Sequence, residues 1–357
     1  MLPPDSLLTL TPEGLFCRAA QAWIDPWRPV PRALITHAHA DHARPGCGEY
    51  WAVGSSEGIL RERLGSGIRL LPVDYGQLHR IGDARVSFHS AGHVLGSAQI
   101  RIEASGESWL VSGDYKRCAD PSCAPFEPVQ ADVLISEATF GLPIYRWQSG
   151  AAVAAEIVRW WRSAPDRPSL LFCYAFGKAQ RVLAELAGLG VEEEVLLHGS
   201  VQRLMEPYRL AGVAMPPTRV LAELPRGESL AGRLVVAPPG AMRGRGLRGL
   251  AQAQSAFVSG WMAVRGARRR RGTGRGFVLS DHADWPGLLQ TVRDSRARQV
   301  YVTHGNSHGL ARYLREVEGI NAEPLEGDFQ RQRNDGGDSP EDAGASRGNQ
   351  GDSAEES

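Results

Sequence analysis

The chain has 357 residues with 40 basic and 40 acidic side chains, and 42% of its residues are hydrophobic, enough for one large or two medium domains with buried cores. No stretch approaches the ~20 apolar residues of a membrane span, and the first residues lack the basic and apolar segments of a signal peptide. The five cysteines form no metal-type pairing. We therefore expect a cytoplasmic protein with reduced thiols and no membrane association.

Negative charge is concentrated at the C-terminus. From Arg331 onward the chain carries three arginines and seven acidic residues, and no aromatic residue follows Phe329. A segment rich in Gly, Ser, Asp and Glu does not bury enough apolar surface to fold, so residues 331–357 are predicted to be a disordered acidic tail.

Short strands and turns are expected in the first third of the chain. In chain order the pattern predicts a strand at 33–36, a helical stretch after Ser55-Ser56 that reaches Leu64 and ends at Gly65, a hairpin of 100–103 and 109–111 around Ser105-Gly106, and a buried strand at 133–136.

From about Gly141 the pattern changes to alternating helices and strands. The predicted helices are 151–161, 178–186 and 201–210, and the predicted strands are 170–174, 195–197, 234–237 and 256–258. Strand–loop–helix units follow at 277–292 and 299–316. Such alternation is typical of a parallel sheet flanked by helices, and the chain contains no internal repeat.

One motif, His37-Ala38-His39-Ala40-Asp41-His42, stands directly after the predicted strand 33–36. In an extended segment residues two apart face the same side, so His37 and His39 can bind one metal ion together. Asp41 and His42 lie further along, on the turn, and can face a second ion. A run of exposed histidines is the alternative, but a buried strand leads into the motif and only alanine separates the ligands.

Three further polar residues stand where predicted strands end or turn. His93 lies in a glycine-rich loop, Asp114 follows the apolar strand 109–111, and His304 follows strand residues Tyr301-Val302-Thr303. Each of them alone is more often a capping or structural residue than a metal ligand. Together with the histidine motif, however, they complete the ligand shells of two metal ions.

We therefore predict a dinuclear metal centre. The ligands divide into His37, His39 and His93 for one ion, Asp41, His42 and His304 for the other, and Asp114 as the bridge. A shell of nitrogen and oxygen donors without cysteine favours zinc, with manganese as the alternative. Two such ions can activate water and hold both the attacking and the leaving oxygens of a phosphate, so the predicted reaction is metal-assisted hydrolysis.

These residues, in this order, resemble the metallo-β-lactamase superfamily along the whole chain except the tail. Three segments are similar to the A, B and C motifs of its β-CASP nuclease branch, and two more match further marks of that branch: 136–140, 280–284 and 303–305, then 176–180 and 258–261. The resemblance implies an α/β fold, a metallo-β-lactamase αβ/βα sandwich with an inserted α/β β-CASP domain. The sandwich would comprise residues 1–140 and 273–330, with the insert at 141–272.

The resemblance also implies roles for individual residues. His282 would contact the scissile phosphate or protonate the leaving oxygen, a role that suits imidazole near neutral pH. Glu137 would orient an active-site histidine without binding metal, although a plain ion-pair role is about as plausible. Asp41 would be essential for catalysis through the metals, and Asp25 would belong to a supporting motif.

Within the branch, Asp25–Val30 and Ile35–Arg44 resemble the opening of the bacterial ligase-associated DNA exonucleases. That family implies a DNA exonuclease that processes single strands or ends in repair, functionally linked to an ATP-dependent DNA ligase and a helicase. His304 points to the alternative, because the RNA-cutting members carry histidine at this position. A β-CASP ribonuclease, or a nucleic-acid-binding subunit without activity, are therefore the rival interpretations.

Two further features are interpreted as nucleic-acid contacts. Four consecutive arginines precede motif B, namely Arg268, Arg269, Arg270 and Arg271. Arginines on a glycine-rich loop near a hydrolytic centre suggest contact with phosphates, and a solvated turn is the alternative. Lys178, inside the 176–180 segment, is assigned the same role.

Overall fold

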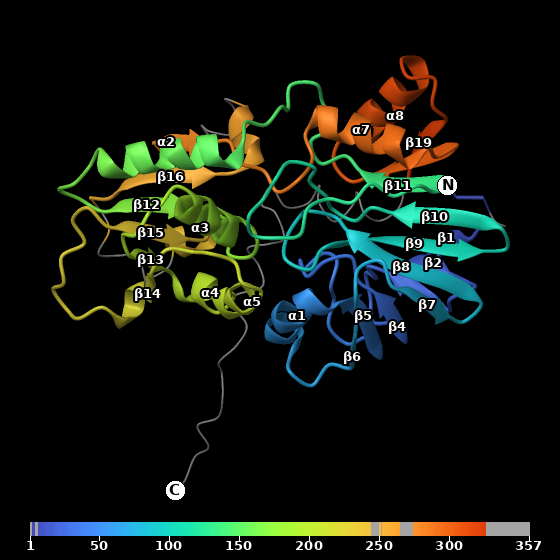
Figure 1. The fold of residues 1–357 in the computed structure, drawn as a ribbon, viewed down its shortest axis with the longest axis horizontal. Coiled ribbons are helices and arrows are strands. Elements are labelled where there is room, and N and C mark those ends of the chain that lie inside the picture. Colours follow the sequence, from blue (N-terminus) through green and yellow to red (C-terminus); the bar gives the residue numbers. More distant parts are fainter. Residues whose placement is uncertain (1, 4–5, 244–249, 251, 265–273, 326–357) are drawn as a thin grey trace, which may run out of the picture.

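The computed structural model describes residues 2–3, 6–243, 250, 252–264 and 274–325. Its described part is a mixed α/β protein with three β-sheets and flanking helices (Figure 1). The predicted acidic tail and the four-arginine run lie outside the described residues.

The first sheet has the strand order β1-β2-β3-β4-β5-β6. Its strands are β1 (Leu8–Thr11), β2 (Gly14–Cys17), β3 (Ala22–Ile24), β4 (Arg32–Leu34), β5 (Glu49–Val53) and β6 (Leu70–Val73). Strands β1 to β3 are antiparallel, and β3 to β6 are parallel. Helix α1 (Glu57–Leu64) connects β5 to β6, and its C-cap is Gly65.

The second sheet has the order β19-β18-β11-β10-β9-β8-β7. Its strands are β7 (Leu78–Ile81), β8 (Ala84–Ser90), β9 (Ala98–Ala104), β10 (Glu107–Val111), β11 (Val133–Glu137), β18 (Gln299–Thr303) and β19 (Ala322–Pro324). Helices α7 (Trp285–Ser295) and α8 (Ser307–Glu316) belong to the same part of the molecule.

These two sheets pack face to face, with helices on their outer faces. The core between them contains Leu15 and Ile24 from the first sheet and Phe88 and Ile100 from the second. Outside the second sheet, α7 and α8 bury residues such as Leu288 against it. On the outer face of the first sheet α1 packs in the same way. The layers are therefore helix, sheet, sheet, helix, which is the metallo-β-lactamase-like sandwich expected from the sequence.

The third sheet lies beside this sandwich and is parallel throughout its six strands (Figure 1). In the order β14-β13-β15-β12-β16-β17 the strands are β14 (Thr218–Val220), β13 (Val195–Leu197), β15 (Leu234–Ala237), β12 (Ser169–Phe172), β16 (Gln254–Val258) and β17 (Arg275–Phe277). Its helices are α2 (Gly150–Arg162), α3 (Lys178–Gly188), α4 (Gly199–Gln202) and α5 (Met205–Leu210). Helices α2 and α3 cover one face, where Val153 and Val182 join the core.

The sequence predictions of individual elements are mostly confirmed. The hairpin of β9 and β10, the strand β11 and the helices α1, α2 and α3 lie where the patterns placed them. The single helix predicted at 201–210 is wrong, because the structure has two short helices there, α4 and α5. Pro207 explains the break, since it has no backbone N–H to donate to the carbonyl of residue 203. The division into domains remains a prediction.

Within the described ranges, no helix is both long and apolar enough to span a bilayer. All five cysteines are free thiols.

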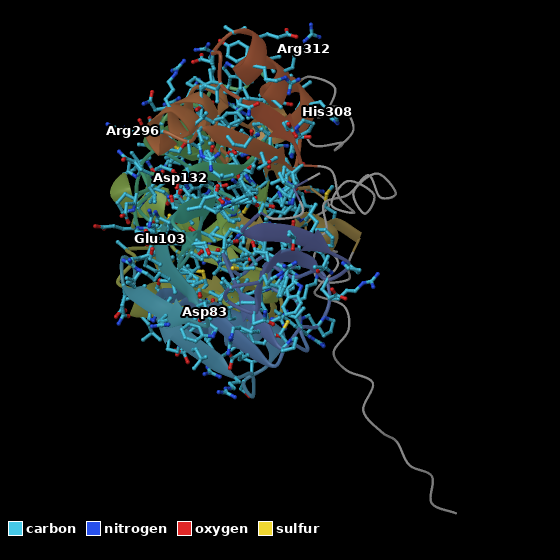
Figure 2. The ribbon with its side chains drawn as sticks, turned by 90° about the vertical axis from the view of Figure 1, so that its right-hand side faces the viewer. Asp83, Glu103, Asp132, Arg296, His308 and Arg312 are labelled. Carbon is cyan, nitrogen blue, oxygen red and sulfur yellow. The ribbon has the colours of Figure 1, made fainter. Side chains whose placement is uncertain are left out.

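Asp132 joins the starts of two neighbouring parallel strands on the side of the molecule shown in Figure 2. Its carboxylate accepts hydrogen bonds from Ser108 Oγ at 2.7 Å and Ser108 N at 2.8 Å, and these bonds lower the pKa of Asp132. Replacing a charged acceptor of this kind should cost about 1–2 kcal/mol. We expect Asp132→Ala to lower the free energy of unfolding at pH 7 by that amount, measured by urea denaturation.

The pH dependence gives a second check on Asp132. A carboxyl group whose pKa is lowered on folding stabilises the protein above its unfolded pKa of about 3.9, and this contribution disappears as the pH falls through the lowered value. The difference between wild type and Asp132→Ala should therefore shrink below about pH 4. Asp83→Ala, at an exposed site in the same view, is the control. A difference that stays constant down to pH 2 would contradict the assignment.

Candidate metal centre

The histidine motif follows strand β4 and lies at the carboxyl edge of the first sheet. Ile35 continues the strand by donating its N–H to Trp51 O at 2.8 Å, and the chain then turns at Thr36. The side chains of His37 and His39 are buried, with 1% and 6% exposure. A strand end thus places two imidazoles in the protein interior, as the sequence predicts.

Asp25 braces this turn from the neighbouring strand β3. The residue has a left-handed backbone (φ 43°) and accepts hydrogen bonds from Thr36 N and His42 Nδ1, both at 2.7 Å. Because His42 donates from Nδ1, its Nε2 atom faces the centre instead. The supporting role expected for Asp25 agrees with this placement.

Two glycines allow the other ligand-bearing loops to approach. Gly113, with φ 56°, precedes Asp114, and a Cβ atom there would lie 2.6 Å from Thr36 Cβ. Gly305, with φ 55°, follows His304, and a Cβ atom there would lie 2.2 Å from Ala138 O. Any larger residue would push the loops away from the centre, so the pattern of a polar residue next to glycine has a steric cause.

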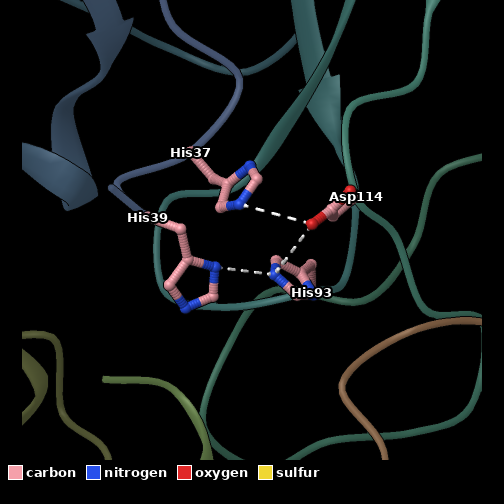
Figure 3. Close-up of side chains that lie close together, drawn as sticks. All are labelled: His37, His39, His93 and Asp114. Atoms are coloured by element: carbon pink, nitrogen blue, oxygen red, sulfur yellow. Dashed lines mark hydrogen bonds and ion pairs between the residues drawn. The ribbon is translucent and has the colours of Figure 1, made fainter. Parts of the chain in front are cut away.

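Asp114 stands in the middle of the imidazoles. Its Oδ2 atom lies 3.7 Å from His37 Nε2 and 4.0 Å from His93 Nε2 (Figure 3). It also lies 3.6 Å from His42 Nε2. His282 Nδ1 also lies 3.9 Å from this oxygen. These distances are too long for hydrogen bonds. They are close to the ~3.4 Å that separates two ligand atoms on one tetrahedral zinc ion with bonds of about 2.1 Å.

The hydrogen bonds around the first group leave unshared lone pairs facing each other. His93 donates from Nδ1 to Asp281 O at 2.7 Å, which leaves Nε2 as an acceptor. His39 has Phe176 O 3.5 Å from its Nε2 atom, so its Nδ1 is the inward acceptor, 3.1 Å from His93 Nε2. Two neutral imidazole acceptors at this distance require a cation or a proton between them.

His37 completes this first group. Among the described residues its buried Nε2 atom has no hydrogen-bond partner. A ligand atom of each of His37, His39, His93 and Asp114 lies within 4.8 Å of the others. A buried imidazole without a partner is costly in an apo protein and is satisfied by a metal, so these residues fit a divalent ion.

The residues predicted for the second ion also come together. Asp41 Oδ2 lies 3.8 Å from His42 Nε2, and the ring centroids of His42 and His304 are 5.6 Å apart. All three residues line one pocket with a free volume of about 40 Å³, which Asp25 and Gly113 also line. This second group is looser than the first, and its occupancy by an ion remains a prediction.

The electrostatics match a cation site. Burial lowers the pKa of His37 and of His93 well below the usual range, and burial likewise lowers the pKa of His39 to about 4. These rings are therefore uncharged, and each can donate a nitrogen lone pair to a metal ion. Burial opposes charge on His42 too, yet the carboxylates of Asp114, Asp41 and Asp25 raise its pKa to about 10. Around His42 the metal-free centre has an excess of negative charge.

His282 and Glu137 form a pair on the other side of Asp114. His282 Nδ1 lies 2.9 Å and 3.0 Å from the two carboxylate oxygens of Glu137. Glu137 is buried and also accepts a hydrogen bond from Tyr115 N at 2.8 Å. Although burial would raise the pKa of Glu137, the nearby His282 lowers it, so the carboxylate is ionised. This placement agrees with a residue that orients an active-site histidine.

Lys178 is placed differently from the expectation. Its side chain is 3% exposed, and its Nζ atom lies 2.8 Å from Asp281 Oδ2. A buried lysine with a carboxylate partner is not available to a phosphate in solution, so the structure contradicts the predicted nucleic-acid contact. The sequence could not show this, because Asp281 is distant in the chain.

Several residues around the centre were not singled out from the sequence. Thr36 lies 3.1 Å from His37 Nδ1 through its Oγ1 atom, and Arg63 on α1 donates a hydrogen bond to Ala38 O. The sequence places Asp281 only in the motif around His282, yet its backbone carbonyl accepts a hydrogen bond from His93. The position of Asp281 next to His282 in the sequence points to the site, but only the contact with His93 in the structure reveals that the Asp281 carbonyl orients a histidine.

Binding of metal should stabilise the fold. A ligand that binds only the folded state at one hundred times its dissociation constant contributes about 2.7 kcal/mol, which for a protein of this size raises Tm by about 4 °C. We expect that shift when zinc or manganese is added to chelator-treated protein and unfolding is followed by calorimetry. Equal Tm values with metal and with excess chelator would contradict a metal site here.

Sequence comparison finds related proteins of greater length. A probable DNA ligase of Opitutus terrae is 31% identical over 308 residues, which are 85% of this chain and 30% of that protein. An endoribonuclease ysh1 of Emericella nidulans is 40% identical over 140 residues, and an endoribonuclease ysh-1 of Neurospora crassa is 34% identical over 131. These matches cover 37% and 35% of this chain, but only 15% and 14% of the two proteins. No family model matches the chain.

The fold is found among solved structures. A protein of unknown function from Enterococcus faecalis V583 superimposes with a TM-score of 0.56, covering 82% of this chain and 79% of that one, at 12% sequence identity. This similarity concerns the fold alone. The sequence relatives support a relation to the metallo-β-lactamase and β-CASP proteins, and the buried His/Asp group could hold a metal ion.

Proposed function

We propose that the chain is a metal-dependent DNA exonuclease that processes DNA ends in repair by hydrolysing phosphodiester bonds. The observation that carries the hydrolytic part is the position of Asp114 Oδ2 between His37, His42 and His93. Divalent ions held by these residues would supply Lewis acidity and an activated water. Zinc suits the donor atoms, with manganese as the alternative.

The protein's own groups complete the reaction. The water oxygen forms a bond to phosphorus and gives up a proton to solvent, while the bond to the leaving nucleotide oxygen breaks and that oxygen takes up a proton. His282 lies beside Asp114, and Glu137 orients the ring through its Nδ1 atom. The other ring nitrogen, Nε2, therefore points away from Glu137. We assign it the delivery of this proton.

DNA is proposed as the substrate because of the extent of similarity. The match to the protein named probable DNA ligase covers 85% of this chain, so almost all of the described sandwich and third sheet has a counterpart there. A ligase joins DNA ends, and a nuclease next to it would prepare such ends. On this basis we also propose a functional link to an ATP-dependent DNA ligase and a helicase.

Ribonuclease activity is the second candidate. The fungal proteins that share 34% to 40% identity with part of this chain are named endoribonucleases. His304 agrees with them, since the RNA-cutting members of the β-CASP branch carry histidine there. These matches cover a smaller part of the chain, so we place RNA second.

A direct test uses single-stranded DNA and RNA of the same sequence, labelled at either end. The purified protein is incubated with each in the presence of zinc or manganese, with Asp41→Ala as the control. Stepwise shortening of DNA that is absent in the variant and slow on RNA supports the proposal and reveals the polarity. Faster cutting of RNA would move the protein to RNA processing. Binding of DNA with two metals and no cleavage would indicate an inactive binding subunit.

A further inference from the structure

A cluster of buried charges lies beside the metal centre and contains no predicted metal ligand. We call it the buried ion cluster and define it by Lys116, Asp120, Lys178, Arg181 and Asp281. The side chain of each of the five is at most 8% exposed. Lys178 Nζ pairs with Asp281 Oδ2 at 2.8 Å, and Arg181 Nη1 lies 3.4 Å from Asp281 Oδ1. Asp120 forms ion pairs with Arg181, whose Nε atom lies 3.3 Å from Asp120 Oδ2, and with Lys116.

The buried ion cluster joins three segments that are far apart in the sequence. Lys116 and Asp120 follow Asp114 in the loop after β10. Asp281 precedes His282 in the loop after β17, and Lys178 and Arg181 come from the first turn of α3. Helix α3 belongs to the third sheet, whereas both loops carry groups of the metal centre. The charges therefore connect the third sheet to the centre.

Contacts from this cluster reach the metal-binding groups through the backbone. Asp281 O accepts the hydrogen bond from His93 Nδ1 at 2.7 Å, which sets the direction of His93 Nε2. Arg181 also donates to Ser280 O, so the backbone just before this carbonyl is held as well. Lys116 Nζ lies 3.5 Å from His93 O. Outer hydrogen-bond partners of this kind fix the orientation of ligating histidines and are worth a factor of 10 to 100 in metal affinity.

The start of α3 is built to hold its charges in this place. Gly177, with φ 83°, donates its N–H to Gln180 Oε1 at 2.8 Å, which caps the helix. A Cβ atom at Gly177 would lie 2.5 Å from Val94 Cγ1, so the helix start packs directly on the residue after His93. Lys178 is the first helical residue and points to Asp281 from this fixed position.

We infer that Lys178 and Asp281 are positioning residues, through which helix α3 holds His93 in the geometry that binds metal. This inference rests on the proposed metal-dependent function, but it concerns metal binding and is tested without substrate. The cost of burying these charges is itself an argument, because a well-packed apolar pair at the same place would serve stability as well or better. The ion pair instead provides a directional link to one backbone carbonyl.

The two residues allow a test that separates position from charge. Lys178→Met makes the surroundings of the centre more negative, so charge alone would strengthen binding of a divalent cation. Asp281→Asn makes them more positive, so charge alone would weaken it. If both residues act by position, both variants bind metal more weakly. We expect dissociation constants for Zn²⁺ and Mn²⁺ to rise about 10- to 100-fold in each, measured by competition with a chromophoric chelator.

A matched control separates position from general loss of stability. Arg233 pairs with Glu194 just before β15, at the end of the third sheet opposite to the start of α3. Arg233→Met therefore removes an ion pair that has no contact with the metal centre. Urea unfolding of all the metal-free proteins is measured alongside. We expect Arg233→Met to keep its metal affinity within a factor of two. Lys178→Gln replaces Lys178→Met if the latter does not fold.

The outcomes decide the inference. Weaker metal binding in both test variants, with Arg233→Met unchanged, supports it. If metal binding becomes stronger in Lys178→Met and weaker in Asp281→Asn, the cluster acts only through its charge, and the inference is overturned. Affinities equal to those of Arg233→Met would make it a structural cluster only, and would also overturn it. A wild-type protein that binds metal in this pattern but cleaves no nucleic acid would refute the proposed function and leave the inference standing.

Discussion

Asp114→Asn should abolish nuclease activity and metal binding while leaving the metal-free fold intact. Asp114 Oδ2 lies 3.6 Å from His42 Nε2 and 3.7 Å from His37 Nε2, so one oxygen serves both halves of the centre. Removing its charge should cost about 4 kcal/mol of transition-state stabilisation, which corresponds to about a thousandfold loss in kcat/KM. Metal content by atomic emission and initial rates on labelled DNA measure the two effects.

The metal-free protein provides the control for Asp114. Burial, with Glu137 nearby, raises the pKa of Asp114, so its ionised carboxylate is held at a cost when no cation is bound. An isosteric neutral amide relieves that cost. We therefore expect the metal-free variant to unfold within about 1 kcal/mol of the metal-free wild type. A large loss of stability would mean that Asp114 acts mainly in folding, and the activity result would then say little about metal.

The histidine motif shows what a sequence can predict about such a centre. His37, His39, Asp41 and His42 lie within six residues, and the apolar strand before them fixes on which side they emerge. Asp114 and His304 could be added because each follows an apolar strand and adjoins a glycine, and the close approaches at Gly113 and Gly305 are the physical reason for that pattern. Local rules of this kind also place most helices and strands.

Lys178 shows where such reasoning fails. A lysine that follows a glycine at the start of a helix can contact a phosphate, and nothing nearby in the sequence reveals the carboxylate partner of Lys178. The partner, Asp281, is about a hundred residues away and meets it only because the third sheet packs beside the sandwich. The role of Asp281 O as the acceptor for His93 is a backbone property, which no side-chain pattern records. Long-range pairs and backbone contacts therefore needed the structure.

His282→Ala should lower kcat without removing metal. A positioned general acid contributes about 10²- to 10⁴-fold, and we expect a loss of that size on DNA. The ring is held by Glu137 through contacts of 2.9 Å and 3.0 Å, so Glu137→Gln should give a smaller loss of the same kind. His308→Ala, at an exposed site labelled in Figure 2, is the control and should retain full activity.

The leaving group distinguishes proton donation from metal binding at His282. A nitrophenyl phosphodiester has a leaving oxygen that needs no proton, so His282→Ala should cleave it at nearly the wild-type rate if its role is that of an acid. Asp114, Glu137 and His282 also have ligand atoms within 4.8 Å of one another and can together hold an ion. In that case His282→Ala would lose metal and would be equally slow on both substrates. Full rates on the activated ester with unchanged metal content would therefore assign the proton to His282.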